Sequence, residues 1–481
     1  MTDYDIIEYP HRPFGQLQPD RFAVLGAMFG MTPRDPACCR VLELGCGSGG
    51  SLVPLAALHP ASSFFGIDLA RTPVEQGRRR IDALGLANIR LEQMDVMDFP
   101  SEAGEFDYII AHGLFSWVPQ QVRERILHLC HLHLAPQGIA CISYNTYPGC
   151  RIRQMFRDMM LFHTAQFDNP QDKIEQARSI VQLVAHGTQR EDGAHRLAKE
   201  EAARLAALSD SSLLHDDLAP VWQPFLFHEF VSLAENHGLQ YLADSSYADM
   251  QAAGITGDAA ALLQTLPAGD RIRYQQYLDF FRMRHFRRTL LCRDSVALHA
   301  EPDVSSVARF HFSAPLHEVP AGSDDVPAEA KSWRNDLNAV AVTTNNPTGL
   351  AVLAAIAEAW PATKSFADMA SSTDNPDALC SSLHAYYASG IINAHALPGS
   401  ASRVAGERPQ VWRVARLEAE MSSSIPNLHL GTIELNDLSL RSLLPMFDGM
   451  RTRGELEAAV GGHDTLQAIL GEMARKALLT A

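Results

Sequence analysis

The segment from Arg40 to Gly50 reads RVLELGCGSGG, and it determines the fold class that we expect for this chain. Its first half is a short apolar run of the kind that forms a buried strand, which predicts a strand at 40–44. Glycines follow at 45, 47, 49 and 50, and a helical pattern begins at Ser51. A strand, a glycine loop and a helix in this order indicate a ligand-binding α/β unit.

The same alternation continues to residue 143. Further strands are predicted at 63–69, 89–93, 106–111 and 138–143, and helices at 51–58, 73–84 and 120–133. Strands separated by helices predict a parallel sheet with helices on both faces. Because ligands of such sheets bind beyond the carboxyl ends of the strands, we expect the chemistry of this protein at those ends.

The glycine loop suits two cofactors. Glycine lets the backbone turn sharply and approach a ligand more closely than a Cβ would allow. Gly45, Gly47 and Gly50 have the GxGxxG spacing of dinucleotide-binding loops, so NAD is one candidate. S-adenosylmethionine (SAM) is the other.

Acidic residues at three successive strand ends favour SAM. Glu43 lies two residues before the first glycine, where negative charge suits an ammonium and a sulfonium group but not a pyrophosphate. Asp68 ends the second strand and can accept hydrogen bonds from both ribose hydroxyls of either cofactor. Asp95 follows the third strand, where it can accept from an adenine amino group with the backbone of Val96 beside the ring edge. Each acid alone could be a cap or a surface residue, but the three together favour SAM.

These motifs resemble those of the class I SAM-dependent methyltransferases. VLELGCGSG, FFGIDL, MDVMDF and FDYIIAHG occur in the family's order between residues 40 and 143. The resemblance implies a Rossmann-like sheet and a SAM site, with His112 after the fourth strand close to the methionine part. The residues expected to bind the cofactor are Glu43, Gly45, Cys46, Gly47, Gly49, Asp68, Leu69, Asp95, Val96 and His112.

Further segments are similar to bacterial methyltransferases that carry a methyltransferase regulatory domain, a group that includes rickettsial protein-lysine methyltransferases. They are AHGLFSWVP at 111–119, SYNTYPG at 143–149, Tyr9-Pro10, 277–293, and a winged-helix-like stretch at 438–461. The resemblance implies a lysine ε-amine as acceptor, with a protein substrate such as an outer-membrane protein before export. The alternatives are a small-molecule methyltransferase of secondary metabolism and a non-catalytic SAM-sensing adaptor.

Candidate catalytic residues surround the end of the fifth strand. A lysine must lose a proton before methyl transfer, and an apolar aromatic slot lowers its pKa by desolvation. Tyr144, Asn145 and Trp117, together with Phe115 and Tyr147, are candidates for this slot. His112 is a candidate general base, although contact with SAM or a packing role is the preferred interpretation. Tyr9 is a candidate for an N-terminal lid.

Charge and motifs argue against nucleic acid as a partner. The net charge is −16, and the position after the fourth strand reads AHGL instead of the [DNS]-P-P-[YFW] of amino-methylating DNA enzymes. The basic runs at 78–80 and 282–288 are interpreted as solvated helix faces or docking sites for acidic patches. The eight cysteines lack zinc-site spacing, and no signal peptide or membrane span is evident, so a cytoplasmic protein without a metal is expected.

At 481 residues the chain should hold several domains. We expect a SAM-binding methyltransferase domain at 1–150, a helical regulatory or substrate domain at 151–295, a linker or irregular arm at 296–335, and a helical, winged-helix-like region at 336–481. The sequence does not identify the acceptor, the number of methyl groups added or the oligomeric state.

Overall fold

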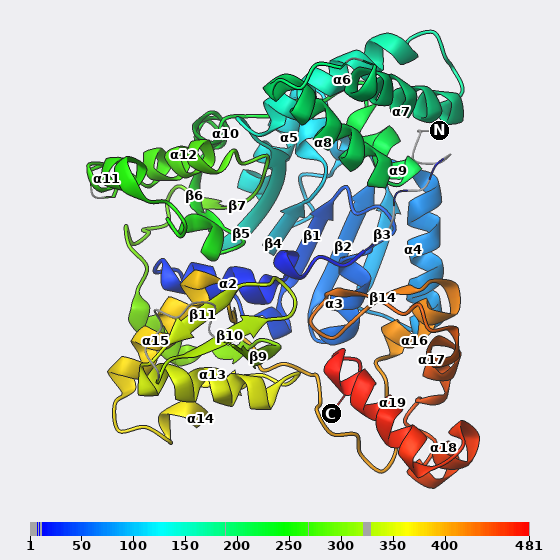
Figure 1. Ribbon diagram of the computed structural model, residues 1–481, viewed down its shortest axis with the longest axis vertical. Helices are drawn as coiled ribbons and strands as arrows, with labels where there is room; N and C mark the ends of the chain where they lie inside the picture. Colours follow the sequence, from blue (N-terminus) through cyan, green and yellow to red (C-terminus); the bar gives the residue numbers. More distant parts are fainter. Residues whose placement is uncertain are drawn as a thin grey trace.

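A seven-stranded sheet lies at the centre of the protein, in the strand order β3-β2-β1-β4-β5-β7-β6 (Figure 1). The computed structural model describes residues 7, 9, 12–187, 189–267, 269–320 and 329–480. The strands are β1 (Arg40–Leu44), β2 (Ser63–Asp68), β3 (Ile89–Gln93), β4 (Phe106–Ala111), β5 (Leu134–Asn145), β6 (Leu239–Asp244) and β7 (Phe286–Arg293). The five strands expected from the sequence therefore all form.

Strands β1 to β5 are parallel to one another, whereas β7 is antiparallel to both of its neighbours, β5 and β6. The chain proceeds from β1 outward to β3 and then returns to β4 on the other side of β1. The order of the strands thus reverses between β1 and β4. This is the switch point at which ligands of doubly wound sheets bind. The predicted α/β fold class is confirmed.

The helices of this domain follow the predicted pattern: α3 (Leu52–Leu58), α4 (Arg71–Leu84) and α5 (Gln120–His133), preceded by α2 (Pro19–Met28). Helix α4 illustrates why they form. Its buried residues are Val74, Gly77, Ile81 and Leu84, which make one apolar stripe at helical spacing. Gly85 then adopts the left-handed conformation, with φ of 58°, and ends the helix.

A helical segment follows β5 and consists of α6 (Cys150–Thr164), α7 (Pro170–His186) and α8 (Gly193–Ala207). These helices have a hydrophobic core of their own, separate from the core around the sheet, with Phe156, Met160, Val181 and Leu205 among its members. They lie beyond the carboxyl ends of the parallel strands (Figure 1). The segment is therefore placed beside the switch point.

The expectation of a helical domain over 151–295 is wrong in two places, because β6 and β7 complete the central sheet. Helix α10 (Phe227–Glu235) precedes β6, and α11 (Gly257–Gln264) and α12 (Arg271–Arg282) lie between β6 and β7. Helix α12 ends at Arg282, because the next residue, Met283, adopts the left-handed conformation with φ of 49°. The apolar run after it is a buried strand, which periodicity alone does not distinguish from a buried helix.

The expected linker at 296–335 is also wrong. This stretch contains β8 (His311–Ser313), β9 (Leu316–Val319) and β10 (Lys331–Asn335), and β10 pairs with β9 and with β11 (Ala341–Thr344). One small sheet thus crosses the expected boundary at 335. It packs with α13 (Pro347–Ala359), whereas β8 pairs with β12 (Lys364–Ser365) and β13 (Asn393–His395) near α14 (Phe366–Ala370) and α15 (Pro376–Ser389).

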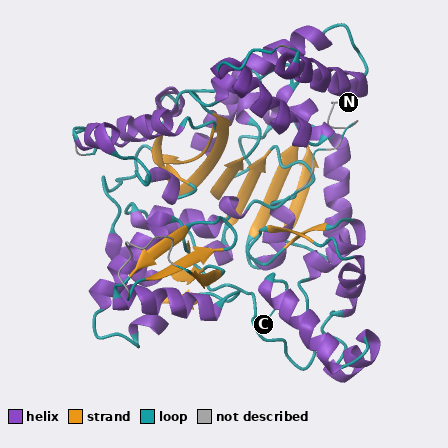
Figure 2. Ribbon diagram, viewed as in Figure 1, coloured by secondary structure: helices purple, strands orange, loops and turns teal. Residues whose placement is uncertain are grey.

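The C-terminal unit is mainly helical with one short β-ribbon (Figure 2). Its elements are α16 (Arg413–Met421), β14 (Ser424–Pro426), β15 (Thr432–Glu434), α17 (Leu438–Leu443), α18 (Arg453–Val460) and α19 (His463–Arg475). Helix α16 contacts α4 of the central domain. Of the helices in the described ranges, none combines the length and the apolar character that crossing a bilayer requires.

Candidate active site

The glycine loop after β1 is shaped by left-handed backbone. Gly45, Gly47 and Gly49 have φ of 76°, 53° and 73°, values that side chains with a Cβ rarely adopt. The amides of Gly45 and Cys46 donate to the carbonyl of Ile67, which fixes the loop on the end of β2. A Cβ added at Gly47 would meet nothing within 4 Å. The loop therefore leaves open space directly above its own backbone.

Asp68 joins the glycine loop to β2. Its Oδ2 accepts a hydrogen bond from the amide of Gly47 at 2.8 Å, and its Oδ1 accepts from the amide of Ala70 at 2.8 Å. The carboxylate thus faces the loop, and its contact with the ribose hydroxyls stays a prediction. The side chain of Leu69 beside it is 55% exposed.

Asp95 has a local structural role at the end of β3. Its Oδ1 accepts from the amide of Met97 at 2.9 Å and caps the short 3-10 helix Val96–Asp98. The Val96 side chain is buried. This arrangement leaves the contact of Asp95 with adenine as a prediction.

Four buried polar atoms without a hydrogen-bond partner among the described residues lie at the strand ends. They belong to the tips of β1, β4 and β5 and to β7: Glu43 Oε2, His112 Nδ1, Asn145 Nδ2 and Arg288 Nε. Strand pairing sets Arg288 opposite Ser143, two residues from Asn145, so these side chains leave the sheet on the same side. A buried polar group without a partner costs about 1–3 kcal/mol, so this face is suited to a polar ligand.

The chemistry of this group of residues fits the methionine end of SAM. That end carries one ammonium and one carboxylate, and the face presents one acid and one guanidinium. Burial and the nearby charge of Asp68 raise the pKa of Glu43 to about 8. An ammonium group placed beside Glu43 would favour its charged form and offset this cost.

His112 lies in an aromatic recess on the same face. Its ring centroid is 4.6 Å from that of Phe14 and 6.0 Å from that of Phe286. Burial, and to a lesser degree the charge of Arg288, lower the pKa of His112 to about 3. The imidazole is therefore neutral at physiological pH and too weakly basic to serve as an effective general base.

The prediction that Tyr144 lines an acceptor slot is wrong. Alternation along β5 sends Tyr144 to the face opposite Asn145, where it is fully buried. Its ring stacks on Phe230 with centroids 3.9 Å apart, and its hydroxyl pairs with Thr289 Oγ1 at 3.0 Å. Phe115 packs against the same cluster, so both rings belong to the core.

The other aromatic candidates are partly exposed. Trp117 is half-buried, and its Nε1 is buried without a partner among the described residues. The Tyr147 hydroxyl donates to Gln154 at 3.1 Å, and the Arg151 guanidinium lies 3.7 Å from its ring centroid, so α6 holds this side chain. Tyr9, the expected lid residue, instead donates to Asp216 Oδ2 at 3.2 Å. Its neighbour Pro10 lies outside the described residues.

Arg288 is a candidate site residue that sequence reasoning missed. The basic run at 282–288 was interpreted as a solvated helix face or a docking site for acidic patches, but Arg287 is buried, and Arg284 and Arg288 are partly buried. Arg287 is fully buried, with its guanidinium 2.8 Å from both carboxylate oxygens of Asp279 and 2.7 Å from Asp244. A signal was available in the sequence FRRTLL at 286–291. If this stretch is a strand, its side chains point alternately to the two faces, so Arg287 and Arg288 lie on opposite faces.

Three known sequence families match separate parts of the chain. Residues 41–138 match a family described as a methyltransferase domain, and residues 209–293 match a predicted methyltransferase regulatory domain. Residues 407–469 match a family described as the PKMT C-terminal winged helix domain. The first match covers the glycine loop and the strands up to the beginning of β5, and the second ends with β7.

Two uncharacterised proteins of Rickettsia prowazekii (strain Madrid E) are similar in sequence. RP028 is 32% identical over 240 residues, which cover 50% of this chain and 96% of that protein. RP789 is 35% identical over 323 residues, which cover 66% of this chain but only 58% of that protein. The solved structure of PKMT2 from Rickettsia typhi in complex with AdoHcy has a TM-score of 0.85 at 24% identity, over 98% of this chain and 100% of that chain. The two chains therefore share a fold.

Sheet order, glycine loop and strand-end acids together define a Rossmann-like methyltransferase. The chain belongs to the SAM-dependent methyltransferases that carry a methyltransferase regulatory domain, and SAM is the methyl donor of this class.

Proposed function

We propose that this chain transfers a methyl group from SAM to the ε-amine of lysine residues in a protein substrate. One observation supports the donor site: buried polar atoms of Glu43, His112 and Asn145 have no hydrogen-bond partner in the part of the chain that the structure describes, and they lie at the strand ends beside the open glycine loop. The lysine acceptor is supported by the match of residues 407–469 to the winged helix domain of PKMT proteins, and by the fold shared with PKMT2 over 98% of the chain.

The strand ends would hold the donor at four points. Asp68 accepts from the ribose hydroxyls, and Asp95 and Val96 lie at the adenine edge. Glu43 pairs with the ammonium group of the methionine part. The guanidinium of Arg288, which is contributed by the regulatory domain, pairs with the carboxylate. Opposite charges on one face thus fix the direction of the sulfonium group within the site.

The chain's own residues would then orient the acceptor. Bound SAM supplies a methyl group on a positively charged sulfur, which a neutral amine attacks in line; the N–C bond forms as the C–S bond breaks. Half-buried Trp117 offers an apolar wall that favours the neutral amine of lysine by desolvation. Asn145 contributes an amide at the end of β5 that limits the rotation of the acceptor or donor group. The methylated ammonium releases one proton to solvent.

To test this proposal, the purified chain is incubated with methyl-labelled SAM and fractionated bacterial lysate. The lysate includes outer-membrane proteins that have not yet been exported, as possible acceptors. Label recovered on lysine residues after proteolysis and mass spectrometry is the expected result. Label in small molecules would instead identify a small-molecule methyltransferase. SAM binding without labelling of either pool would favour a SAM-sensing adaptor.

A further inference from the structure

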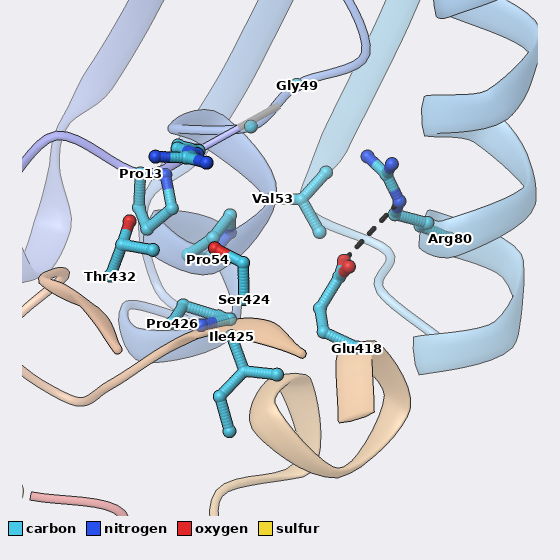
Figure 3. A pocket seen from close by; sticks show the side chains of 12 residues that line it. Pro13, Gly49, Val53, Pro54, Arg80, Glu418, Ser424, Ile425, Pro426 and Thr432 are labelled. Atoms are coloured by element: carbon cyan, nitrogen blue, oxygen red, sulfur yellow. Dashed lines mark ion pairs between the residues drawn. The ribbon is translucent and has the colours of Figure 1, made fainter. Parts of the chain in front are cut away.

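The C-terminal unit lies against the back of the glycine loop. Helix α16 and strand β14 approach α3 and α4 where the loop leads into α3 (Figure 3). Four parts of the chain line the pocket between them: the N-terminal segment with Pro13, the glycine loop and α3 with Gly49 and Val53, α4 with Arg80, and the C-terminal unit with Glu418 and Ile425. The C-terminal unit, which lies more than 330 residues further along the sequence, thus borders the glycine loop.

An ion pair crosses this junction. Arg80 Nε lies 3.4 Å from Glu418 Oε1, and the two side chains are only 11% and 7% exposed (Figure 3). Solvent screens such a pair weakly, so the position of each charge depends on the other.

The same guanidinium holds the glycine loop. Arg80 Nη1 donates to the backbone carbonyl and to Oγ of Ser48, each at 3.2 Å. Ser48 lies between Gly47 and Gly49, and the Gly47 amide is held on the other side by Asp68. Close packing adds to this restraint, because a Cβ at Gly77 would lie 2.7 Å from the Ser48 carbonyl oxygen. The loop is therefore fixed from β2 on one side and from α4 on the other.

We propose that Glu418 is a positioning residue through which the C-terminal winged-helix unit sets the conformation of the glycine loop, and with it the affinity for the donor. The inference rests on the proposed donor site. Without the Glu418 carboxylate, the Arg80 guanidinium loses the ion pair that joins it to α16, and its contact with Ser48 is less firmly held. Because coupling between sites is reciprocal, donor binding also strengthens the docking of α16. A protein that pulls α16 away would lower donor affinity.

The test compares Glu418→Gln with wild type by calorimetry with AdoHcy (S-adenosylhomocysteine) and by amide hydrogen exchange of residues 45–50 and 413–426. The expected result is AdoHcy binding weakened about tenfold, with faster exchange of residues 45–50 in the free variant. Glu420→Gln is the matched control, because Glu420 is an exposed acid on the same helix. Arg80→Lys retains the charge but cannot reach Glu418 and Ser48 together, and it should reproduce the effect. Adding Glu418→Gln to the Arg80→Met variant should weaken AdoHcy binding no further.

Each outcome separates the coupling from the donor site. Wild-type AdoHcy affinity and unchanged loop exchange in both Glu418→Gln and Arg80→Lys would overturn the coupling and leave the donor site standing. A lower melting temperature with unchanged affinity would also overturn it, since the contact would then only stabilise the fold. If wild-type protein does not bind AdoHcy, the donor site fails, and loop exchange in the free variants still decides whether Glu418 positions the loop.

Discussion

The carboxylate of Asp68 accepts a hydrogen bond from the backbone amide of Gly47 at 2.8 Å. This contact joins the second strand to the loop that follows the first, so one acid supports the loop and also faces the proposed ribose position. The tip of β2 thereby shapes the glycine loop beside the proposed donor site. The predictions for SAM binding depend on this arrangement.

Replacement of Asp68 by Ala should weaken AdoHcy binding by about 2 kcal/mol, roughly 30-fold, because the ribose contacts and the Gly47 restraint are lost together. Isothermal calorimetry measures the change. The Asp98→Ala variant is the control, since Asp98 is exposed on the adjacent 3-10 helix. Equal affinity in Asp68→Ala and wild type would remove Asp68 from the site.

SAM binding should strengthen as pH rises toward 8. Burial and Asp68 raise the pKa of Glu43 to about 8, so the free protein holds a proton on this carboxyl at neutral pH. An ammonium partner favours the charged form, so binding releases that proton, and affinity falls by up to tenfold per pH unit below 8. Calorimetry in buffers of different ionisation enthalpy measures the proton release. In Glu43→Gln the pH dependence that comes from Glu43 should be lost, and only that of SAM itself should remain. An identical pH profile of SAM affinity in Glu43→Gln and wild type would contradict the pairing of Glu43 with the ammonium group.

Arg288→Met should weaken AdoHcy binding about tenfold or more, because the methionine carboxylate loses its cationic partner. Methylthioadenosine has no amino-acid part, so its affinity should be unaffected by this variant, although Asp68→Ala should weaken it. Arg273→Met, on the exposed surface of α12, is the control. An equal loss for both ligands in Arg288→Met would show that Arg288 supports the fold instead of the carboxylate.

Tyr144 should act on stability instead of turnover. Tyr144→Phe removes only the hydroxyl that pairs with Thr289, so about 1 kcal/mol of unfolding free energy is lost and kcat is retained. Tyr144→Ala leaves a cavity beside Phe230 and should cost about 3–5 kcal/mol. Chemical denaturation and steady-state kinetics measure the two quantities. A large drop of kcat in Tyr144→Phe at unchanged stability would instead show that the Tyr144 hydroxyl acts in the acceptor site.

Local signals in the sequence were sufficient to predict strands β1 to β5 of the central sheet and the helices between them. The strand 40–44 and the helix 120–133 have the bounds expected from periodicity, and the glycines at 45, 47 and 49 adopt the left-handed backbone that only glycine accepts readily. Each of these features is encoded within about fifteen neighbouring residues. Motif spacing then identified which strand ends carry the acids.

Features that depend on distant pairing were missed. The face on which Tyr144 lies follows from the register of β5 with β4 and β7, which the sequence of β5 alone does not specify. Strand β7 lies in the segment 151–295 that was expected to be helical, because periodicity alone does not distinguish a buried strand from a buried helix. The contact of Arg80 with Glu418 joins residues in different domains, and no local sequence pattern predicts it.

Titration of the purified chain with AdoHcy and with NAD by calorimetry tests most directly whether the strand ends form a site for an adenosyl donor. We predict that AdoHcy binds one per chain and that Asp68→Ala weakens this binding, whereas NAD gives no heat of binding. Binding of NAD in the absence of any binding of AdoHcy would contradict the account.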